Sequence, residues 1–345
     1  ININKDINTI NIIIYIILII TLLMGVKGDV GTPIAYQYDM QKKAVSPFES
    51  SGSTSRYVLT EAIVKNRTFY LDQNQARFAA PDIVYFRNKF ISIFTPGISF
   101  IAIPFYYVGT LLKIPQLITY LSTLVFALLN CILIYQLAKS IGTKHYAAIM
   151  SSIVFMFGTN ALPYAYTLTQ HHGSIFIILL QIILYLRPPS FFAAILMGSS
   201  WGIGLLFDIP NLILTTPIIF AFLLKYLRIS DAGRKFNLSI KMSFIGLILG
   251  ILPFVWLFAW YNYKTTGSYI TVGQSLGRSN FFEPEPAEVN KQLIIKELSV
   301  YEKKYALETR NQMHELFILL ISNQRSWLYY SPIVFVGIYG LWLYG

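Results

Sequence analysis

The feature that most constrains this chain is a series of apolar runs, each close to the length that a membrane requires. A helix needs about 20 mainly apolar residues to cross the hydrocarbon core of a bilayer. Runs of this kind cover residues 10–26, 115–137, 146–163, 173–187, 189–207, 210–227, 242–262 and 327–344. Charged residues make up 12% of the chain, against about 25% in soluble domains. The sequence therefore predicts an all-α integral membrane protein, a bundle of about eight or nine transmembrane helices.

The first apolar run is predicted to be an anchor helix within residues 1–26. A secretory signal peptide is the alternative. However, the run is longer than the apolar core of such a peptide, and no small-residue cleavage site precedes Lys27. The chain begins with Ile1 and stops directly after its last apolar run, so we expect it to be part of a longer protein.

The charges of the connecting loops predict how the chain is oriented in the membrane. Lys and Arg gather in alternate loops, at 139–144, at Arg187 and over 225–241, whereas the loops at 164–172 and at Asp208 carry none. Cytoplasmic loops are enriched in Lys and Arg. We therefore expect the loops without these residues, together with the long polar segments on the same side of the bundle, to be extracytoplasmic.

This orientation also explains the formal net charge of +11. Basic cytoplasmic loops face anionic membrane lipids. The sequence has no RNA-binding motif and no basic stripe with interleaved aromatic residues, so nucleic acid is not an expected partner.

The apolar stretch 91–112 is predicted not to cross the membrane fully. If residues 27–90 are external, an odd number of crossings must separate them from Lys139, and residues 115–137 already supply one. Pro96 and Pro104 interrupt the stretch, and non-helical backbone at membrane depth is tolerated where it lines a cavity or is buried in protein. We therefore expect a re-entrant or juxtamembrane element. The alternative is a full span that violates the charge rule.

These arguments divide the chain into five parts. They are an anchor helix (1–26), an external loop with juxtamembrane or re-entrant elements (27–114), a transmembrane bundle (115–262), a second external loop (263–326) and a further transmembrane helix (327–345). Within the second loop, apolar residues from Leu293 to Tyr301, including Leu298, have helical spacing. This spacing predicts a solvated or surface helix there.

Ionisable groups at the edge of a membrane are costly unless they face a cavity or a partner, so each is a candidate functional residue. Asp208 is one, because it lies between two apolar runs. A structural alternative exists, since Asp before Pro210 could cap the helix that follows.

Two adjacent histidines, His171 and His172, lie in the uncharged external loop. Three roles are open: an interfacial pair without a ligand, a metal site, or a contact to phosphate oxygens. A metal site lacks support, because no His-x-x-x-His motif and no nearby cysteine supplies further ligands. The only cysteine, Cys131, lies within an apolar run and excludes an intrachain disulfide.

Several motifs, taken in order, resemble those of the polytopic superfamily C glycosyltransferases, the protein-mannosyltransferase-like enzymes that use dolichyl- or polyprenyl-phosphate sugars. The motifs are "SRYVLTEAIVKNRTFYLD", "DIVYFRNKFISIFTPGISFIAIPFYYVG", "FGTNALPYAYTLTQHHGSIFI", "YNYKTTGSYITVGQ" and "RSWLYYSPIVFVGIYGLW". Together they extend over most of residues 55–345.

The resemblance implies a multi-pass enzyme that moves a sugar from a polyprenyl phosphate to an acceptor at the extracytoplasmic face. In that family an external-loop carboxylate acts on the acceptor hydroxyl and cationic groups hold the lipid phosphate. The implied catalytic residues are Asp39 and Glu49. The implied phosphate- and sugar-binding residues are Arg56, Lys89, His171, His172 and Arg325. The implied supporting residues are Asp82, Asp208 and Asn262. No metal ligand and no cofactor is assigned, although a divalent cation is compatible with the chemistry.

The chain departs from the family pattern at several positions. Ser53 and Thr54 stand where the family often has an Asp-Glu pair, so Asp39 or Glu49 would have to supply the carboxylate. Phe94 and Thr95 stand where the family has Lys and the first Pro of Lys-Pro-Pro-Gly, and Ser326 replaces a Gly. These departures favour a non-catalytic relative as one alternative function.

A lipid or sugar transporter is the other alternative. A transporter is expected to place charged residues or broken helices near the middle of the bilayer, whereas the polar residues of this chain gather on one side. The expected partners are a polyprenyl-phosphate sugar, a glycan, lipid or protein acceptor, and membrane lipids.

Overall fold

The structure, a computed structural model, describes residues 3–26, 51–188, 190–225, 242–281, 298–301, 312–322 and 326–344. Asp39, Glu49 and Arg325 lie outside the described residues. The chain is mostly helical, as the sequence predicts, with one small sheet.

Two strands of the sheet come early in the chain, between residues 79 and 97, and the other two come late, after residue 266. In chain order, the elements are as follows. They are α1 (Ile3–Met24), α2 (Ser51–Asn66), α3 (Gln73–Ala79), β1 (Ile83–Phe86), β2 (Lys89–Ser92), α4 (Gly97–Leu111), α5 (Pro115–Ser140), α6 (His145–Phe157), α7 (Ala161–Ala165), α8 (His171–Leu186), α9 (Phe191–Phe207), α10 (Pro210–Leu224), α11 (Met242–Thr266), the 3₁₀ turn η3 (Gly273–Leu276), β3 (Arg278–Phe281), β4 (Leu298–Tyr301), α13 (Gln312–Leu320), α14 (Trp327–Tyr330) and α15 (Ile333–Tyr344).

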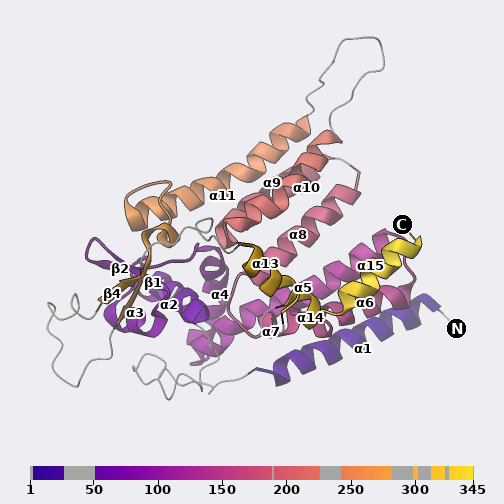
Figure 1. Ribbon diagram of the computed structural model, residues 1–345, viewed down its shortest axis with the longest axis horizontal. Helices are drawn as coiled ribbons and strands as arrows, with labels where there is room; N and C mark the ends of the chain where they lie inside the picture. Colours follow the sequence, from indigo (N-terminus) through magenta and orange to yellow (C-terminus); the bar gives the residue numbers. More distant parts are fainter. Residues whose placement is uncertain are drawn as a thin grey trace, which may run out of the picture.

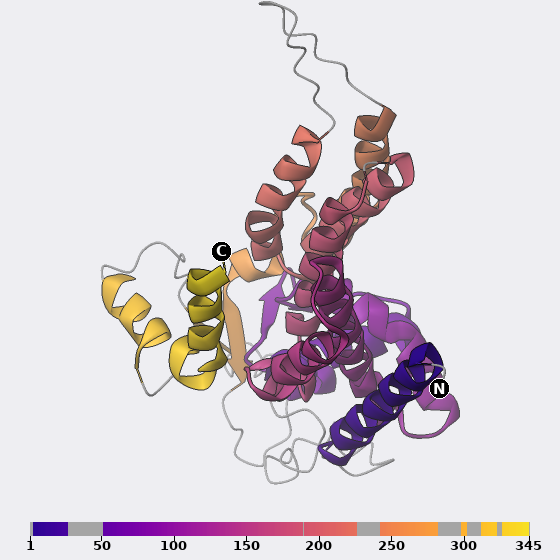
Figure 2. The ribbon, with the colours of Figure 1, turned by 90° about the vertical axis from the view of Figure 1, so that its right-hand side faces the viewer.

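The long helices form an elongated bundle with the sheet at one end. In Figure 1, α8, α9, α10 and α11 lie together, α1, α5 and α6 lie along the other side, and α2, α3 and the strands gather at one end. The turned view of Figure 2 places α13, α14 and α15 to one side of this bundle. The C-terminal end of α11 reaches the end that carries the sheet (Figure 1).

Each apolar run predicted from the sequence contains a helix or a pair of helices. Two helical segments among the described residues, Pro115–Ser140 and Phe244–Thr266, are long and apolar enough to cross a membrane by length and composition. The helices α4, α6, α8, α9, α10 and α15 are apolar but shorter. The run 146–163 is divided at Gly158 between α6 and α7, so its apolar residues do not form one continuous helix.

Helices α9 and α11 pack closely because small residues occupy their contact. Glycines spaced four apart occur in both helices, namely Gly198 and Gly202 on α9 and Gly246 and Gly250 on α11. A Cβ atom at Gly198 would collide with the carbonyl oxygen of Leu247, and one at Gly250 with that of Ile195. Small-xxx-small spacing of this kind permits close backbone approach between apolar helices.

The same contacts give the direction of the pair. A Cβ atom at Gly246 would lie 2.9 Å from the carbonyl oxygen of Phe191, and one at Gly202 would lie 2.7 Å from Cβ of Phe254. Later residues of α9 therefore meet later residues of α11, so the two helices are parallel. Their C-terminal ends therefore point to the same end of the bundle.

The four strands form an antiparallel sheet in the order β2-β1-β3-β4. Arg87 and Asn88 both have left-handed backbone angles, with φ of 50° and 61°, and this geometry matches the twist of a two-residue hairpin between β1 and β2. The helix expected around Leu298 and Tyr301 is wrong at these residues, because they form β4 and pair with β3. Pairing with a distant strand decides this, not the local spacing.

The segment 91–112 follows its prediction only in part, because Pro96 precedes the start of α4 but Pro104 does not interrupt the helix. Its first residues complete β2, and α4 then continues from Gly97 to Leu111 with Pro104 inside it. Pro104 is exposed, so the helix passes through this proline with the ring directed away from the α2 and α5 contacts. The expected break is therefore absent within α4.

We expect Gly250→Val to lower the stability of the folded protein by about 1–3 kcal/mol or more, because an added side chain must separate α9 from α11. Thermal unfolding of the purified protein in detergent measures this effect. Gly337→Val is the matched control, since nothing lies within 4 Å of a Cβ atom at that helical glycine. Equal melting temperatures for the two variants would contradict the packing argument.

Candidate functional site

The guanidinium group of Arg56, on α2, lies against the residues that precede α4 and α8. Arg56 is 3% exposed. Its Nη1 donates to the carbonyl oxygen of Gly52 at 2.8 Å, and its Nη2 donates to Oε1 of Gln170. The group stacks on the ring of Phe94 at 3.7 Å from the ring centroid. Both of these hydrogen-bond acceptors are neutral.

Helix α2 holds Arg56 in place through contacts of its backbone and its neighbours. The hydroxyl of Ser99 on α4 donates to the carbonyl oxygen of Arg56 at 2.9 Å, and Thr60 donates to the same oxygen at 2.9 Å. Ser55 donates to the carbonyl oxygen of Asp82 and contacts the hydroxyl of Ser92 at the end of β2. The arginine is therefore fixed by α2, α4 and the sheet together.

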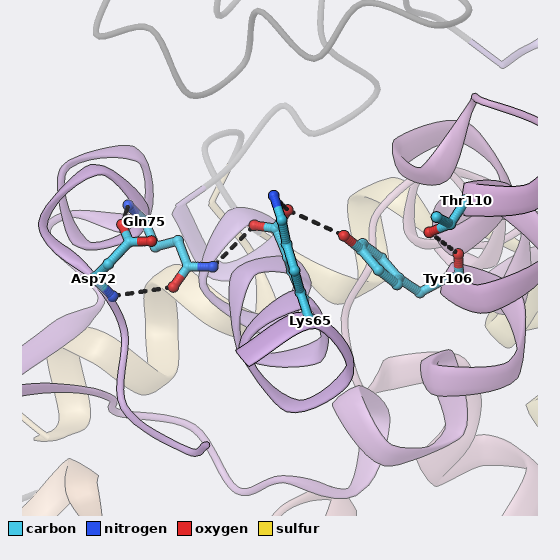
Figure 3. Close-up of polar contacts among 6 residues, drawn as sticks. Lys65, Asp72, Gln75, Tyr106 and Thr110 are labelled. Carbon is cyan, nitrogen blue, oxygen red and sulfur yellow. Dashed lines mark hydrogen bonds and ion pairs between the residues drawn. The ribbon is translucent and has the colours of Figure 1, made fainter. Parts of the chain in front are cut away.

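A second polar cluster anchors the other end of α2 (Figure 3). The buried carboxylate of Glu61 accepts hydrogen bonds from Gln75 at 2.9 Å and from the hydroxyl of Tyr106 at 3.0 Å. Lys65, on the next turn, lies 3.8 Å from the same carboxylate. Gln75 also completes a capping box with Asp72 at the start of α3. Glu61 thus joins α2 to α3 and α4.

Gln170 connects Arg56 to Asp208. Its Oε1 accepts from Arg56, and its Nε2 donates to Oδ2 of Asp208 at 3.0 Å. Gln170 lies directly before α8, and Asp208 lies directly after α9. A neutral amide therefore separates the cation from the carboxylate, and the two charges form no ion pair.

The charge of Arg56 is incompletely compensated. Among the residues that the structure describes, no carboxylate forms an ion pair with it, and its Nε is buried without a hydrogen-bond partner. Burial lowers the pKa of Arg56 to about 10, and the charges of Asp208 and Asp82 oppose this shift. The side chain remains a cation at neutral pH, and its Nε–H makes no hydrogen bond.

The carboxyl group of Asp208 is partly shielded from water, and this changes its pKa. Burial raises its pKa, while the hydrogen bond from Gln170, the charge of Arg56 and a backbone hydrogen bond from Ile209 lower it. The predicted role as a helix cap is not found, because Ile209 occupies the cap position of α10 and no side chain caps that end. Its carboxylate is directed to Gln170 instead.

Asp82 lies beside the same centre. A Cβ atom at Gly52 would lie 3.8 Å from Oδ2 of Asp82 and 3.3 Å from Nη1 of Arg56, so both side chains approach this glycine. Oδ1 of Asp82 is 3.3 Å from Arg278 on β3. The carboxylate is therefore placed between an exposed and a buried arginine.

The two histidines have different environments. His172 is fully buried, its Nε2 is 2.8 Å from the carbonyl oxygen of Ala161, and its Nδ1 is 3.1 Å from Nδ2 of Asn130. These contacts fix the tautomer with the proton on Nε2 and leave no ring nitrogen for a phosphate. This corrects the expectation for His172, whose contacts are those of a structural residue.

His171 is half-buried at the first position of α8, and its ring packs on that of Tyr164 with centroids 4.1 Å apart. It follows Gln170 directly. Burial and the nearby charge of Arg56 both lower the pKa of its imidazole. Of the two histidines, His171 is the one that belongs to the candidate site.

Two other predicted residues lie away from Arg56. Lys89 begins β2, is exposed and lies over the ring of Tyr70 at 3.9 Å. Three residues of strand, about 10 Å, separate it from the Ser92 contact with α2. Asn262 is buried near the end of α11 and donates to the carbonyl oxygen of Tyr269. The structure therefore brings together Arg56, Asp82, Asp208 and His171, without Lys89 or Asn262.

Sequence reasoning missed three residues of the site. Gln170 is neutral and stands beside the more conspicuous histidines. Phe94 was noted only as a departure from the family, yet its ring supports the guanidinium. Gly52 supplies a carbonyl oxygen, which no side-chain pattern reveals. Ser53 and Thr54, by contrast, are fully buried, so a carboxylate in their place would require partners inside the protein.

Within the described part of the chain, no group of three or more His, Cys, Asp or Glu residues could hold a metal ion. Comparisons with protein-family models, with curated proteins and with solved structures found no match to this chain. The site is therefore interpreted from its own geometry.

We expect the two histidines to respond differently to substitution. His172→Ala removes the ring's hydrogen bonds to Asn130 and to the buried carbonyl oxygen of Ala161, and should cost about 1–3 kcal/mol of stability. His171→Ala should change stability by less than about 1 kcal/mol, since half-buried residues lose less on truncation. Thermal unfolding of both variants measures the difference, and a larger loss for His171→Ala would contradict these assignments.

Proposed function

We propose that this chain is a multi-pass membrane glycosyltransferase that transfers a sugar from a polyprenyl phosphate to an acceptor hydroxyl at the extracytoplasmic face. In this proposal eight or nine segments cross the bilayer, with α5 and α11 as the longest. The end of the bundle that carries Arg56 is the external end.

The observation that carries the proposal is the buried guanidinium of Arg56 with an unused N–H group and, among the described residues, no paired carboxylate. Burying a charge without a counterion is costly, so the site is suited to an anion. A guanidinium matches the geometry of phosphate oxygens. The order of the sequence motifs favours a lipid phosphate as that anion.

Asp208 is the described carboxylate best placed to act on the acceptor. In the proposed reaction, the acceptor oxygen bonds to the anomeric carbon of the sugar while the bond from that carbon to the phosphate oxygen breaks. Asp208 accepts the hydroxyl proton, and the lipid phosphate departs with its electron pair, stabilised by Arg56. His171 can donate a hydrogen bond to the same phosphate. Asp39 and Glu49, the carboxylates first implied by the family, remain candidates for the same role.

A non-catalytic relative is the second candidate, and one observation favours it. Ser53 and Thr54 replace the family's Asp-Glu pair and are fully buried, so these positions offer no carboxylate to a substrate. Such a relative would bind the lipid phosphate through Arg56 without transferring its sugar.

We expect Arg56→Gln to weaken binding of a polyprenyl phosphate by about 10-fold to 100-fold, because one or more charged hydrogen bonds are lost. Binding is measured on the purified full chain in detergent by native mass spectrometry with undecaprenyl phosphate. The matched control is Arg67→Gln, which removes an exposed arginine near the end of α2. Equal binding by both variants and the unchanged chain would refute the role of Arg56.

We expect release of lipid phosphate when the chain is given polyprenyl-phosphate hexoses and a mixture of glycan, lipid and peptide acceptors. Asp208→Asn should lower this rate by about 100-fold or more, since general-base catalysis contributes a factor of about 10² to 10⁴. Asp39→Asn and Glu49→Gln test the other carboxylates in the same assay. Phosphate binding without release under all conditions would favour the non-catalytic relative, and movement of the lipid across liposomes would favour a transporter.

The proposed base also gives a pH prediction. Activity should fall as pH decreases through the pKa of Asp208, because the protonated carboxyl no longer accepts a proton. The hydrogen bond from Gln170 lowers this pKa, so Gln170→Met should raise it and move the acidic limb of the kcat/KM profile to higher pH. Asn74→Leu, which likewise replaces an amide by an apolar group at an exposed position on α3, is the control. An acidic limb that stays in place in Gln170→Met would exclude Asp208 as the titrating group.

A further inference from the structure

A group of exposed cations and aromatic side chains lies on the hairpin turn and the end of α11, apart from the Arg56 site. We call it the basic–aromatic edge and define it by Arg87, Lys89, Tyr263, Lys264 and Tyr269. The members come from two segments distant in sequence, the turn between β1 and β2 and the C-terminal end of α11 with the residues after it.

Contacts between the two segments hold the edge together. The hydroxyl of Tyr70 donates to the carbonyl oxygen of Lys264 at 2.6 Å, and the ammonium of Lys89 lies 3.9 Å from the centroid of the Tyr70 ring. Arg87 lies over Gly267, where a Cβ atom would be 2.6 Å from its Nη1. Gly267 has a φ of 79°, a backbone conformation that favours glycine.

The cations of the edge have no acidic partner within the described residues. Arg87, Lys89 and Lys264 are exposed, and none forms an ion pair with a described carboxylate. The carboxylate of Asp72, which is close along the chain, caps the start of α3. The edge therefore presents three positive charges to whatever lies outside it.

Aromatic and apolar side chains accompany these charges. Tyr263 and Tyr269 are stacked with ring centroids 4.6 Å apart and are 46% and 60% exposed, and Ile270 at the tip of the turn is 88% exposed. On the same helix, Trp256 is 66% exposed, one heptad before Tyr263. Aromatic rings followed by a terminal lysine are typical of a helix end at a membrane–water interface.

We infer that the basic–aromatic edge is a docking surface for anionic phospholipid headgroups at the bilayer surface beside α11. Arg87, Lys89 and Lys264 contact the headgroup phosphates, while Tyr263, Tyr269 and Ile270 enter the interfacial layer. Charge complementarity and continuity with the apolar segment Phe244–Thr266 favour this occupant over an acidic protein or glycan. The inference rests on the membrane placement of α11 in the proposed function.

Lipid retention by the full chain tests the charges. Native mass spectrometry compares the binding of phosphatidylglycerol with that of phosphatidylcholine. The combined variant Arg87→Gln, Lys89→Gln and Lys264→Gln should lose its preference for phosphatidylglycerol by at least about 10-fold. The comparison variant, Lys113→Gln, Lys139→Gln and Lys144→Gln, removes the same number of exposed positive charges from the turns before and after α5, and so measures the general attraction of basic loops for anionic lipid. An equal loss in both variants would overturn a specific docking surface.

A fluorescent probe tests the depth of the turn. In a Cys131→Ala background, Ile270→Cys carries an environment-sensitive dye in nanodiscs of phosphatidylglycerol, with Gln274→Cys as the exposed comparison. The dye at position 270 should shift to shorter wavelength and be quenched by headgroup-region quenchers more strongly than the dye at position 274. Equal, water-like emission at both positions would overturn the inference.

The outcomes also separate this inference from the proposed function. A chain that transfers lipid-linked sugar but shows neither effect would overturn the edge alone. A chain with both effects and no transfer would leave the edge intact and refute the transferase. If the triple edge variant loses transfer while it keeps phosphatidylglycerol, the edge binds the acceptor and the lipid inference is wrong.

Discussion

The structure depends on how one buried cation is held without a counterion among the described residues. A guanidinium that leaves water loses a large solvation energy, and a carboxylate within contact distance would be the usual compensation. Arg56 instead has the carbonyl oxygen of Gly52, the amide of Gln170 and the ring of Phe94. These neutral groups orient the side chain but leave its charge available to an incoming anion.

The same arrangement accounts for an aromatic residue at position 94, where the proposed family relationship would place a lysine. A second cation there would repel the Arg56 guanidinium at close range, whereas an aromatic face attracts it. Gln170 has a comparable effect on Asp208. By standing between the carboxylate and the arginine, it prevents a direct ion pair that would neutralise both groups. Arg56 and Asp208 are thus linked through hydrogen bonds to Gln170 without forming an ion pair.

The sequence predicted the helices well because apolar composition over a long run is a local property. It predicted the strands poorly, because Leu298 and Tyr301 pair with β3 across a long stretch of chain. Among the site residues, charge drew attention to Arg56 and Asp208, whereas the neutral Gln170 carried no such signal. His171 and His172 looked equivalent, yet one step along a helix turns a side chain by about 100°, which separates the site from the core. The glycine spacing in α9 and α11 was a readable signal of close packing that periodicity alone did not identify.

If the chain spans the membrane as proposed, the unequal lengths of the parallel helices α9 and α11 have a consequence for the bilayer around them. With 17 and 25 residues, they measure about 26 and 38 Å at 1.5 Å per residue. The longer helix exceeds a hydrocarbon layer about 30 Å thick, whereas the shorter one falls short of it and leaves Asp208, at its end, below the level of the headgroups. The bilayer beside α9 must then become thinner to match the length of this helix, which is a form of hydrophobic mismatch. Local thinning would lower a lipid phosphate toward Arg56, so that the donor reaches the site by sinking with its leaflet and without leaving the bilayer.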